Sequence, residues 1–170
     1  FSEALRMGAE VFMALKKLLK SQKQSTSVGD EGGFAPNLSA NEEGIKVVLQ
    51  AIENAGFVPG KQVMLALDVA ANEWVRNEGY HLFKSAPDKM LSADALIGQY
   101  ERWLSQYPLV SIEDGLGEDD WSGWKQMTQR LGGRIQIVGD DLFVTNPQRL
   151  RRGIKEGSAN AILIKVNQIG

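Results

Sequence analysis

Four charged residues stand directly after four short apolar runs, where they could build a cation site. Asp68 follows "VMLAL", Glu113 follows "LVSI", Asp140 follows "IQIVG" and Lys165 follows "AILI". If these runs are parallel strands, their carboxyl ends lie on one face, which is where barrel active sites form. Three carboxylates gathered there repel one another unless a cation lies between them. Oxygen ligands without histidine or cysteine favour Mg²⁺ over zinc.

Each of these residues also has a simpler interpretation. An Asp or Glu after a strand is often the N-cap of the next helix, although three such acids in succession favour a shared site. Lys165 lies in the apolar run "AILIKV", which predicts that its side chain is partly desolvated and that its pKa is therefore lowered. A lysine with a lowered pKa can act as a general base. The alternative is a lysine that is ion-paired with the neighbouring carboxylates and stays protonated. Both interpretations of Lys165 remain open at this point.

A second acidic feature is the stretch "VGDEGGFAPN", residues 28–37, in which Asp30 and Glu31 precede two glycines. The glycines allow backbone conformations that regular elements exclude, so an acid here can approach another group closely. The stretch is not a phosphate-binding P-loop, because no Gly-Lys-Ser/Thr follows it. A plain turn, in which one acid caps a neighbouring helix, is the alternative.

The elements that would position these residues alternate between helix and strand. Helical spacing predicts helices over residues 1–20, 39–54 (with Ser39 and Glu42 as a capping box), 92–107, 119–131 and 147–156. The apolar runs predict strands over residues 63–67, 109–112, 135–139 and 161–164. Strands alternating with helices predict parallel βαβ units, and therefore an α/β fold.

Composition narrows the classes of function. The chain has 170 residues, a formal net charge of −2 and no cysteine. This length suits one domain, and the charge gives no sign of a nucleic-acid partner. The absence of cysteine excludes disulfides and thiolate metal sites within the chain. No apolar run is long enough to predict a membrane span.

Five segments together resemble the successive signature segments of the enolases. They are "VGDEGGFAPN", "LALDVAANE", "VSIEDGL", "IVGDDLFVTNP" and "ILIKVNQIG", and they occur in the order and at the approximate spacing of that family. The segments "SIEDGL" and "VGDDLF" resemble bacterial enolases more than eukaryotic ones, which tend to have proline after "SIED". The resemblance covers nearly all of the chain and implies a partial TIM-like (β/α) barrel, with residues 1–170 forming part of the C-terminal barrel domain.

The resemblance also implies roles for individual residues in the dehydration of 2-phosphoglycerate to phosphoenolpyruvate. Asp68, Glu113 and Asp140 match the ligands of the catalytic Mg²⁺. Lys165 matches the base that removes the C2 proton, and Glu31 matches the acid that helps the C3 hydroxyl leave. Glu113, Asp140 and Lys165 also match positions that the family places against substrate.

Further expectations come from the family rather than from single residues. The N-terminal domain and the last barrel strands of an enolase are missing from the segment, so the segment alone is expected to be inactive. The family is commonly oligomeric, which implies a homo-oligomer for the full-length protein. A cytoplasmic location is expected, with secretion or cell-surface display also known for the family.

Two alternatives compete with an enolase. Another member of the enolase superfamily, such as a racemase or a sugar-acid dehydratase, would also place three acids at strand ends. Such enzymes usually carry the base in a K-x-K pattern before the first ligand, and we find none in the expected position before Asp68. The other alternative is a non-catalytic protein that binds partners at the cell surface.

Overall fold

The computed structural model describes residues 1–77 and 79–169, and the chain divides into two compact units, Phe1–Met64 and Leu65–Gly170. The first unit contains two α-helices, and the second contains the named strands and three further α-helices. The final residue of "ILIKVNQIG", Gly170, lies outside the described residues. That residues 1–170 form part of a single barrel domain stays a prediction.

The first unit pairs helix α1 (Ser2–Ser21) with helix α2 (Asn41–Asn54). Both are amphipathic, and their apolar sides bury residues such as Leu19 and Ile52. The N-terminus of α2 differs in detail from the prediction, because Ala40 is its N-cap. Ser39 instead donates from its backbone N–H and its hydroxyl to the carboxylate of Glu43, at 2.8 Å in both cases.

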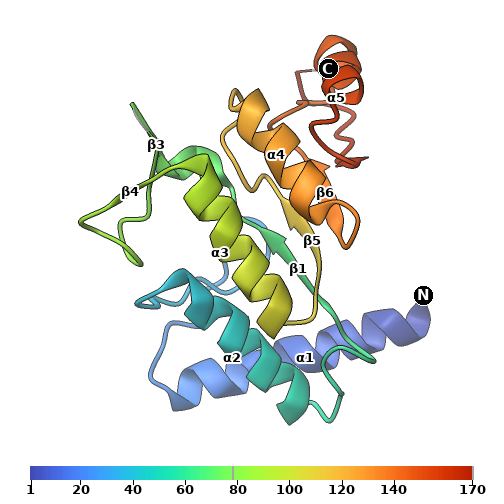
Figure 1. The fold of residues 1–170 in the computed structure, drawn as a ribbon. Coiled ribbons are helices and arrows are strands. Elements are labelled where there is room, and N and C mark those ends of the chain that lie inside the picture. Colours follow the sequence, from blue (N-terminus) through green and yellow to red (C-terminus); the bar gives the residue numbers. More distant parts are fainter. Residues whose placement is uncertain (78, 170) are drawn as a thin grey trace. The chain divides into compact units, whose positions relative to one another are not determined.

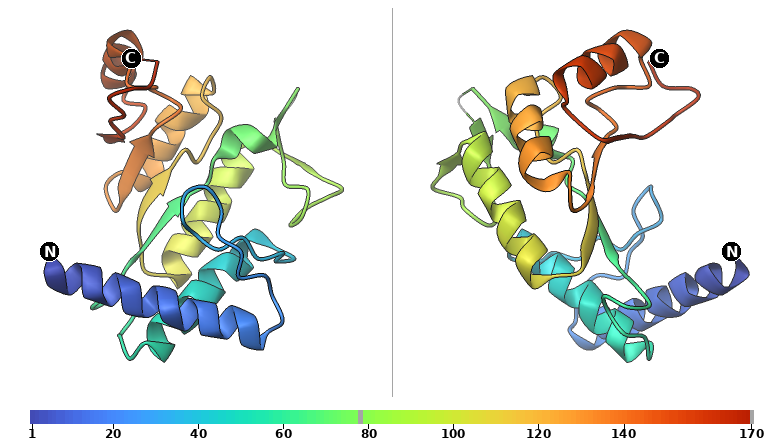
Figure 2. Two further views of the ribbon diagram at one scale, coloured as in Figure 1. Left: turned by 180° about the vertical axis from the view of Figure 1, so that it is seen from behind. Right: turned by 45° about the vertical axis from the view of Figure 1, so that its right-hand side comes forward.

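The second unit is built on a four-stranded parallel sheet in the order β1-β5-β6-β7. The strands are β1 (Leu65–Asp68), β5 (Leu109–Glu113), β6 (Gln136–Gly139) and β7 (Ala161–Ile162). Helices α3 (Ala93–Gln106), α4 (Trp121–Leu131) and α5 (Pro147–Glu156) lie between successive strands in the chain. Figures 1 and 2 show α3 and α4 side by side on one face of the strands. The predicted α/β fold with parallel strands is therefore confirmed.

The helix ends follow the local signals in the sequence. The Ser92 side chain caps α3 by accepting from the backbone N–H of Ala95, and Asn146 caps α5 directly before Pro147. Gly157 ends α5 at φ 68°, a left-handed conformation that glycine adopts without a Cβ clash. Between these ends, the apolar faces of α3 and α4 meet β5 and β6 in a core that contains Trp124 and Ile112.

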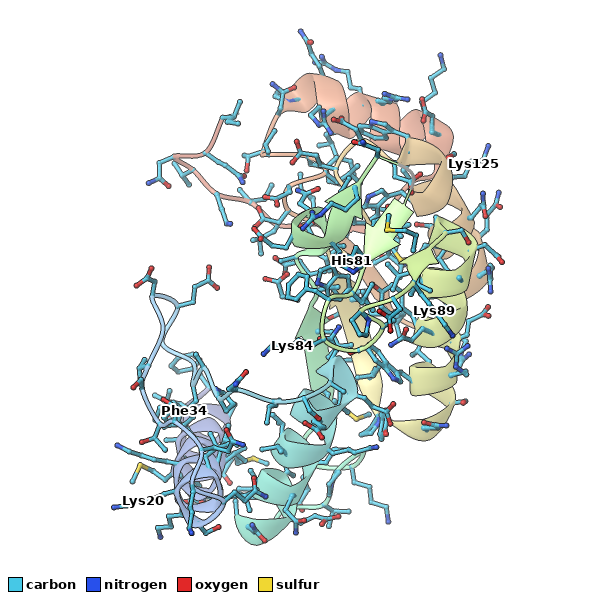
Figure 3. All side chains as sticks on the ribbon, turned by 90° about the vertical axis from the view of Figure 1, so that its left-hand side faces the viewer. Lys20, Phe34, His81, Lys84, Lys89 and Lys125 are labelled. Atoms are coloured by element: carbon cyan, nitrogen blue, oxygen red, sulfur yellow. The ribbon has the colours of Figure 1, made fainter. Side chains whose placement is uncertain are left out.

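A small antiparallel sheet was not predicted. It contains β2 (Val75–Arg76), β3 (Gly79–His81) and β4 (Met90–Leu91), and a 3-10 turn, η1 (Ala71–Trp74), precedes it. These strands have two or three residues each, which is too short for alternation to be visible in the sequence. Figure 3 shows His81 within this hairpin region. Among the described helices, none combines the length and apolarity needed to cross a bilayer.

Candidate active site

Strand register brings the predicted acids to one edge of the sheet. Asp68 and Glu113 are the last residues of β1 and β5, and they are direct partners in the parallel register. Asp140 follows β6 at once, and Val138 of that strand pairs with Glu113. Neighbouring strands lie roughly 4.8 Å apart, so Asp68, Glu113 and Asp140 occupy adjacent positions along this edge.

Lys165 reaches the same edge from a loop rather than from a strand end. Strand β7 ends at Ile162, two residues before the predicted end of the strand, and Lys165 lies three residues beyond it. Its Nζ forms an ion pair with Asp140 Oδ2. The side chain of Lys165 is 44% exposed, whereas that of Asp140 is 9% exposed. The ion-paired alternative for Lys165 is thus the arrangement found, and its desolvation is only partial.

The pKa of Glu113 reflects its burial and the negative charges around it. Burial, and after it the charges of Asp68, Asp140 and Asp114 in that order of importance, raise the pKa of Glu113 to about 7, while the charge of Lys165 opposes them. A carboxylate in water would titrate near 4.5. Such a cluster of mutually repelling acids is the setting in which a bound cation is most favourable.

Asp114 is a fourth acid at this edge, and the sequence analysis did not single it out. Among the described residues, Glu113, Asp114 and Asp140 each offer a carboxylate oxygen such that the three atoms lie within 4.8 Å of one another. Asp68 is not in that group, although its charge acts on Glu113. The only sign of Asp114 in the sequence was its place beside Glu113 in "SIEDG". Which acids bind a metal remains a prediction.

A hydrogen-bonded ring holds Lys165 and Asp140 together. Gln168 Nε2 donates to Asp140 Oδ1 at 3.1 Å, and the hydroxyl of Thr145 donates to Gln168 Oε1 at 3.0 Å. The Thr145 hydroxyl also accepts the backbone N–H of Lys165 at 2.9 Å. Thr145 and Val144 both have positive φ, 56° and 42°, which is unfavourable for β-branched residues. Strain of this kind is characteristic of functional loops.

Three aromatic side chains fix the loop that follows β5. Tyr100 donates from its hydroxyl to the carbonyl of Gly115 at 2.8 Å, and Trp124 Nε1 donates to the carbonyl of Gly117 at 3.0 Å. The Tyr80 hydroxyl accepts from the Gly117 N–H at 3.0 Å and donates to Asp120 at 2.7 Å. The backbone next to Glu113 is therefore tied to α3, α4 and β3.

Glu31 lies in the first unit, at the tip of a closed loop. Val28 and Phe34 form an isolated antiparallel bridge, and the Gly29 N–H donates to the Gly33 carbonyl at 2.9 Å. Phe34 stacks on Phe12 of α1 with ring centroids 4.4 Å apart, and Figure 3 shows it beside that helix. Glu31 itself is exposed. Its assignment as an acid therefore rests on the resemblance and not on a distance to the other site residues.

Comparison with known proteins identifies the family. The family model for the enolase C-terminal TIM barrel domain matches residues 1–170. The chain belongs to this enolase family. It is 60% identical over 171 residues to the enolase of Wolinella succinogenes, and 57% identical over 170 residues to that of Natranaerobius thermophilus. All of this chain is covered in both comparisons, but only 40% and 39% of the two relatives.

The family membership confirms the resemblance that the five segments carried. It also places the four-stranded sheet of the second unit in a TIM barrel family, where the carboxyl edge of the strands is the expected position of an active site. The side chains that sequence reasoning missed are Asp114, Thr145 and Gln168. Thr145 and Gln168 lay within "VTNP" and "KVNQIG", but nothing in their spacing indicated that they would bond to each other.

Proposed function

We propose that this chain supplies the base, one acid and the metal ligands of a glycolytic enolase. Such an enzyme is a lyase that reversibly dehydrates 2-phosphoglycerate to phosphoenolpyruvate in the presence of Mg²⁺. The observation that carries the proposal is the meeting of Glu113, Asp140 and Lys165 at the carboxyl edge of the parallel sheet, in a chain matched over its whole length by an enolase family.

The donor set suits Mg²⁺. The residues at the edge offer carboxylate oxygens, which are the ligands that this hard cation prefers. The pKa of Glu113 is raised first by burial and then by the charges of the neighbouring acids, which a bound cation would offset. Asp68, Glu113 and Asp140 would hold the ion. When bound, Mg²⁺ supplies positive charge opposite the negative charge that develops on the substrate carboxylate as the C2 proton leaves.

Lys165 removes the C2 proton in this proposal. Its Nζ lies at the end of a side chain that the ring of Thr145, Gln168 and Asp140 holds at the acidic edge. Lys165 acts here as the neutral amine, after the ammonium of the ion pair with Asp140 has given its proton to solvent; Nζ then accepts the C2 proton, and the electron pair of the C2–H bond goes into the substrate. Positioned general bases typically contribute about 10²–10⁴-fold to the rate, and a lysine or histidine base working with one or two Mg²⁺ ions is the pattern of this superfamily.

Glu31 completes the dehydration. Loss of the C3 hydroxyl breaks a C–O bond, and a proton from the Glu31 carboxyl lets the group leave as water while the C2–C3 double bond forms. The loop that carries Glu31 is closed by the Val28–Phe34 bridge and anchored by Phe34 on α1, so its tip presents the acid on a defined backbone. Glu113, Asp140 and Lys165 would also contact the substrate.

Three parts of the proposal come from the family alone. These are assembly of the whole protein as a homo-oligomer, a cytoplasmic location, and secretion or surface display. The partner proposed for the site is the small-molecule substrate, and no role for nucleic acid is proposed.

The test uses a chimera: the Wolinella succinogenes enolase in which the matching segment is replaced by residues 1–170 of this chain. We expect phosphoenolpyruvate from 2-phosphoglycerate, and we expect a chelator to abolish it. Lys165→Ala should also abolish exchange of the C2 proton with solvent. Glu31→Gln should retain that exchange while losing dehydration, because only the second step needs its proton.

Matched controls separate these roles from general damage. Lys125→Ala changes an exposed lysine of α4 (Figure 3), and Asp30→Asn changes the acid next to Glu31 on the same loop. Both should leave product formation close to that of the unchanged chimera. Equal loss of exchange in Lys165→Ala and Glu31→Gln would contradict the division of labour. A folded chimera that binds Mg²⁺ but forms no phosphoenolpyruvate would point to a different reaction of the superfamily.

A further inference from the structure

We propose that Asp114 is a positioning residue that sets the place of Asp140, and that it does not itself coordinate the cation. The inference rests on the proposed function only in taking Asp140 to be a metal ligand. It concerns the one acid of the close group Glu113, Asp114 and Asp140 to which the family resemblance gave no role.

Both carboxylate oxygens of Asp114 are already engaged by peptide N–H groups. Oδ1 accepts from the backbone N–H of Asp140 at 3.1 Å, and Oδ2 accepts from that of Asp141 at 2.9 Å. The residue is 4% exposed. If one of these oxygens turned to a metal ion, it would leave without a partner either the buried N–H of Asp140 or the part-buried N–H of Asp141, which is costly. The side-chain partners of the Asp140 carboxylate, Lys165 and Gln168, can rearrange more easily than a peptide group.

The backbone of Asp114 makes two further connections. Its N–H donates to the carbonyl of Val138 at 3.1 Å, and its own carbonyl accepts from the N–H of Ala71 at 3.0 Å. One residue thus joins the carboxyl ends of β1, β5 and β6, where Asp68, Glu113 and Asp140 lie. Its φ of 42° lies in the left-handed region, which Asp adopts more readily than most residues.

Strand register explains why Asp140 needs such a connection. Val138 is the register partner of Glu113, so Asp140 lies two residues further along its strand direction. An extended chain would carry it roughly 6.6 Å beyond Glu113, at about 3.3 Å per residue. Oxygens of the two carboxylates nevertheless lie within 4.8 Å of each other. Strand β6 ends at Gly139, and the Asp114 carboxylate accepts from the next two amides, those of Asp140 and Asp141, so it holds the backbone from which the Asp140 side chain reaches the group.

The first experiment needs no substitution. Residue-resolved hydrogen exchange is measured on the chimera with and without Mg²⁺. We expect the amides of Asp140 and Asp141 to exchange slowly in both conditions, because Asp114 stays bonded to them. The amide of Asp114, bonded to Val138, serves as the internal control. Loss of protection at Asp140 and Asp141 on adding Mg²⁺ would mean that the Asp114 carboxylate moves to the ion, and would overturn the proposal.

The second experiment compares Asp114→Asn with the predicted ligand variant Glu113→Gln by calorimetric titration with Mg²⁺. Asp114→Asn keeps one acceptor oxygen, so we expect a saturable site whose affinity is about 10- to 100-fold weaker, as for other residues that orient ligands. Its kcat should fall more than its KM changes. Glu113→Gln should show no binding at the same concentrations.

Each opposite result is informative. Complete loss of binding in Asp114→Asn, equal to that in Glu113→Gln, would make Asp114 a ligand. Normal Mg²⁺ affinity and kcat in Asp114→Asn would make it merely structural. If Asp114→Asn does not fold, the exchange experiment on the unchanged chimera decides. Because neither Mg²⁺ titration nor exchange uses substrate, a chimera that binds Mg²⁺ without making phosphoenolpyruvate would refute the proposed function and leave this inference standing.

Discussion

Glu113→Gln should have opposite effects on stability with and without Mg²⁺. The substitution keeps the shape of the side chain and removes one negative charge from a cluster in which burial and three neighbouring acids raise the pKa of Glu113 to about 7. In the metal-free protein at pH 8, ionised Glu113 therefore disfavours the folded state. The neutral glutamine lacks this penalty, so the variant is expected to be more stable than the wild type in a chelator.

The magnitude follows from the pKa. A rise from 4.5 to about 7 corresponds to at most about 3.4 kcal/mol, at 1.36 kcal/mol per pH unit. Because Glu113 is partly exposed, solvent screens its neighbours, and we expect about 1–2 kcal/mol instead.

The pH dependence has a defined sign. A carboxyl whose pKa is higher in the folded than in the unfolded state binds more protons when folded, so the stability of the wild type falls as the pH rises from 4.5 to 7. The advantage of the variant should be complete above about pH 7 and should shrink as the pH falls toward 4.5.

Mg²⁺ should reverse the order of stability, so that the wild type becomes more stable than Glu113→Gln. A ligand that binds only the folded state adds about 2.7 kcal/mol at a hundred times its dissociation constant. The wild-type chimera should gain this stabilisation, and Glu113→Gln should not. Thermal melting of both proteins, in chelator and in Mg²⁺, measures this reversal as a change in which protein has the higher melting temperature. Glu53→Gln, at an exposed glutamate of α2, is the matched control and should melt like the wild type in both conditions.

Two outcomes would refute the reasoning. If Glu113→Gln melts below the wild type in chelator at pH 8, the acids do not repel one another as their positions imply. If it gains as much stability from Mg²⁺ as the wild type does, Glu113 is not a ligand.

Three further substitutions test the surrounding structure in the same chimera. Thr145→Val removes the hydroxyl that bonds Gln168 and the Lys165 N–H, so phosphoenolpyruvate formation should fall about 10-fold, whereas Thr145→Ser should retain most of it; equal rates would exclude a role for the hydroxyl. Tyr80→Phe leaves the Gly117 N–H without its acceptor and should cost about 1–3 kcal/mol, seen as a lower melting temperature with Mg²⁺ affinity retained. Ser158→Ala removes a buried hydroxyl that has no hydrogen-bond partner among the described residues, so melting should stay unchanged or rise by a few degrees.

Features set by nearby residues could be predicted from the sequence. The caps at Ser92 and Asn146 and the helix end at Gly157 each depend on bonds to residues a few positions away, and they lie at the bounds of the helices that the sequence predicted over residues 92–107 and 147–156. The parallel strands followed from apolar runs, although β7 is shorter than its run, because Leu163 and Ile164 continue as an irregular segment after only two paired residues.

Features set by distant residues could not be predicted in this way. The Asp114 carboxylate bonds amides 26 and 27 positions later in the chain, and Thr145 bonds a residue 23 positions away. No periodicity or spacing in the sequence indicates that such residues form hydrogen bonds with each other. Even the predicted capping box differs in one residue, because Ser39 bonds to Glu43 and not to Glu42. The two glutamates are adjacent, so the sequence alone does not indicate which of them bonds to Ser39.

The positions of the acids come from two different levels of structure. Asp68 and Glu113 are register partners at the ends of β1 and β5, so the ladder of backbone hydrogen bonds fixes their spacing. Asp140 is beyond the last residue of β6, and its place depends on a loop that buried side chains must hold. The loop is also where strained φ angles occur, at Val144 and Thr145. A substitution in the loop can therefore move one acid relative to the other two without disturbing the sheet. We expect changes to Asp114 or Thr145 to alter the site while leaving the strands of the second unit intact.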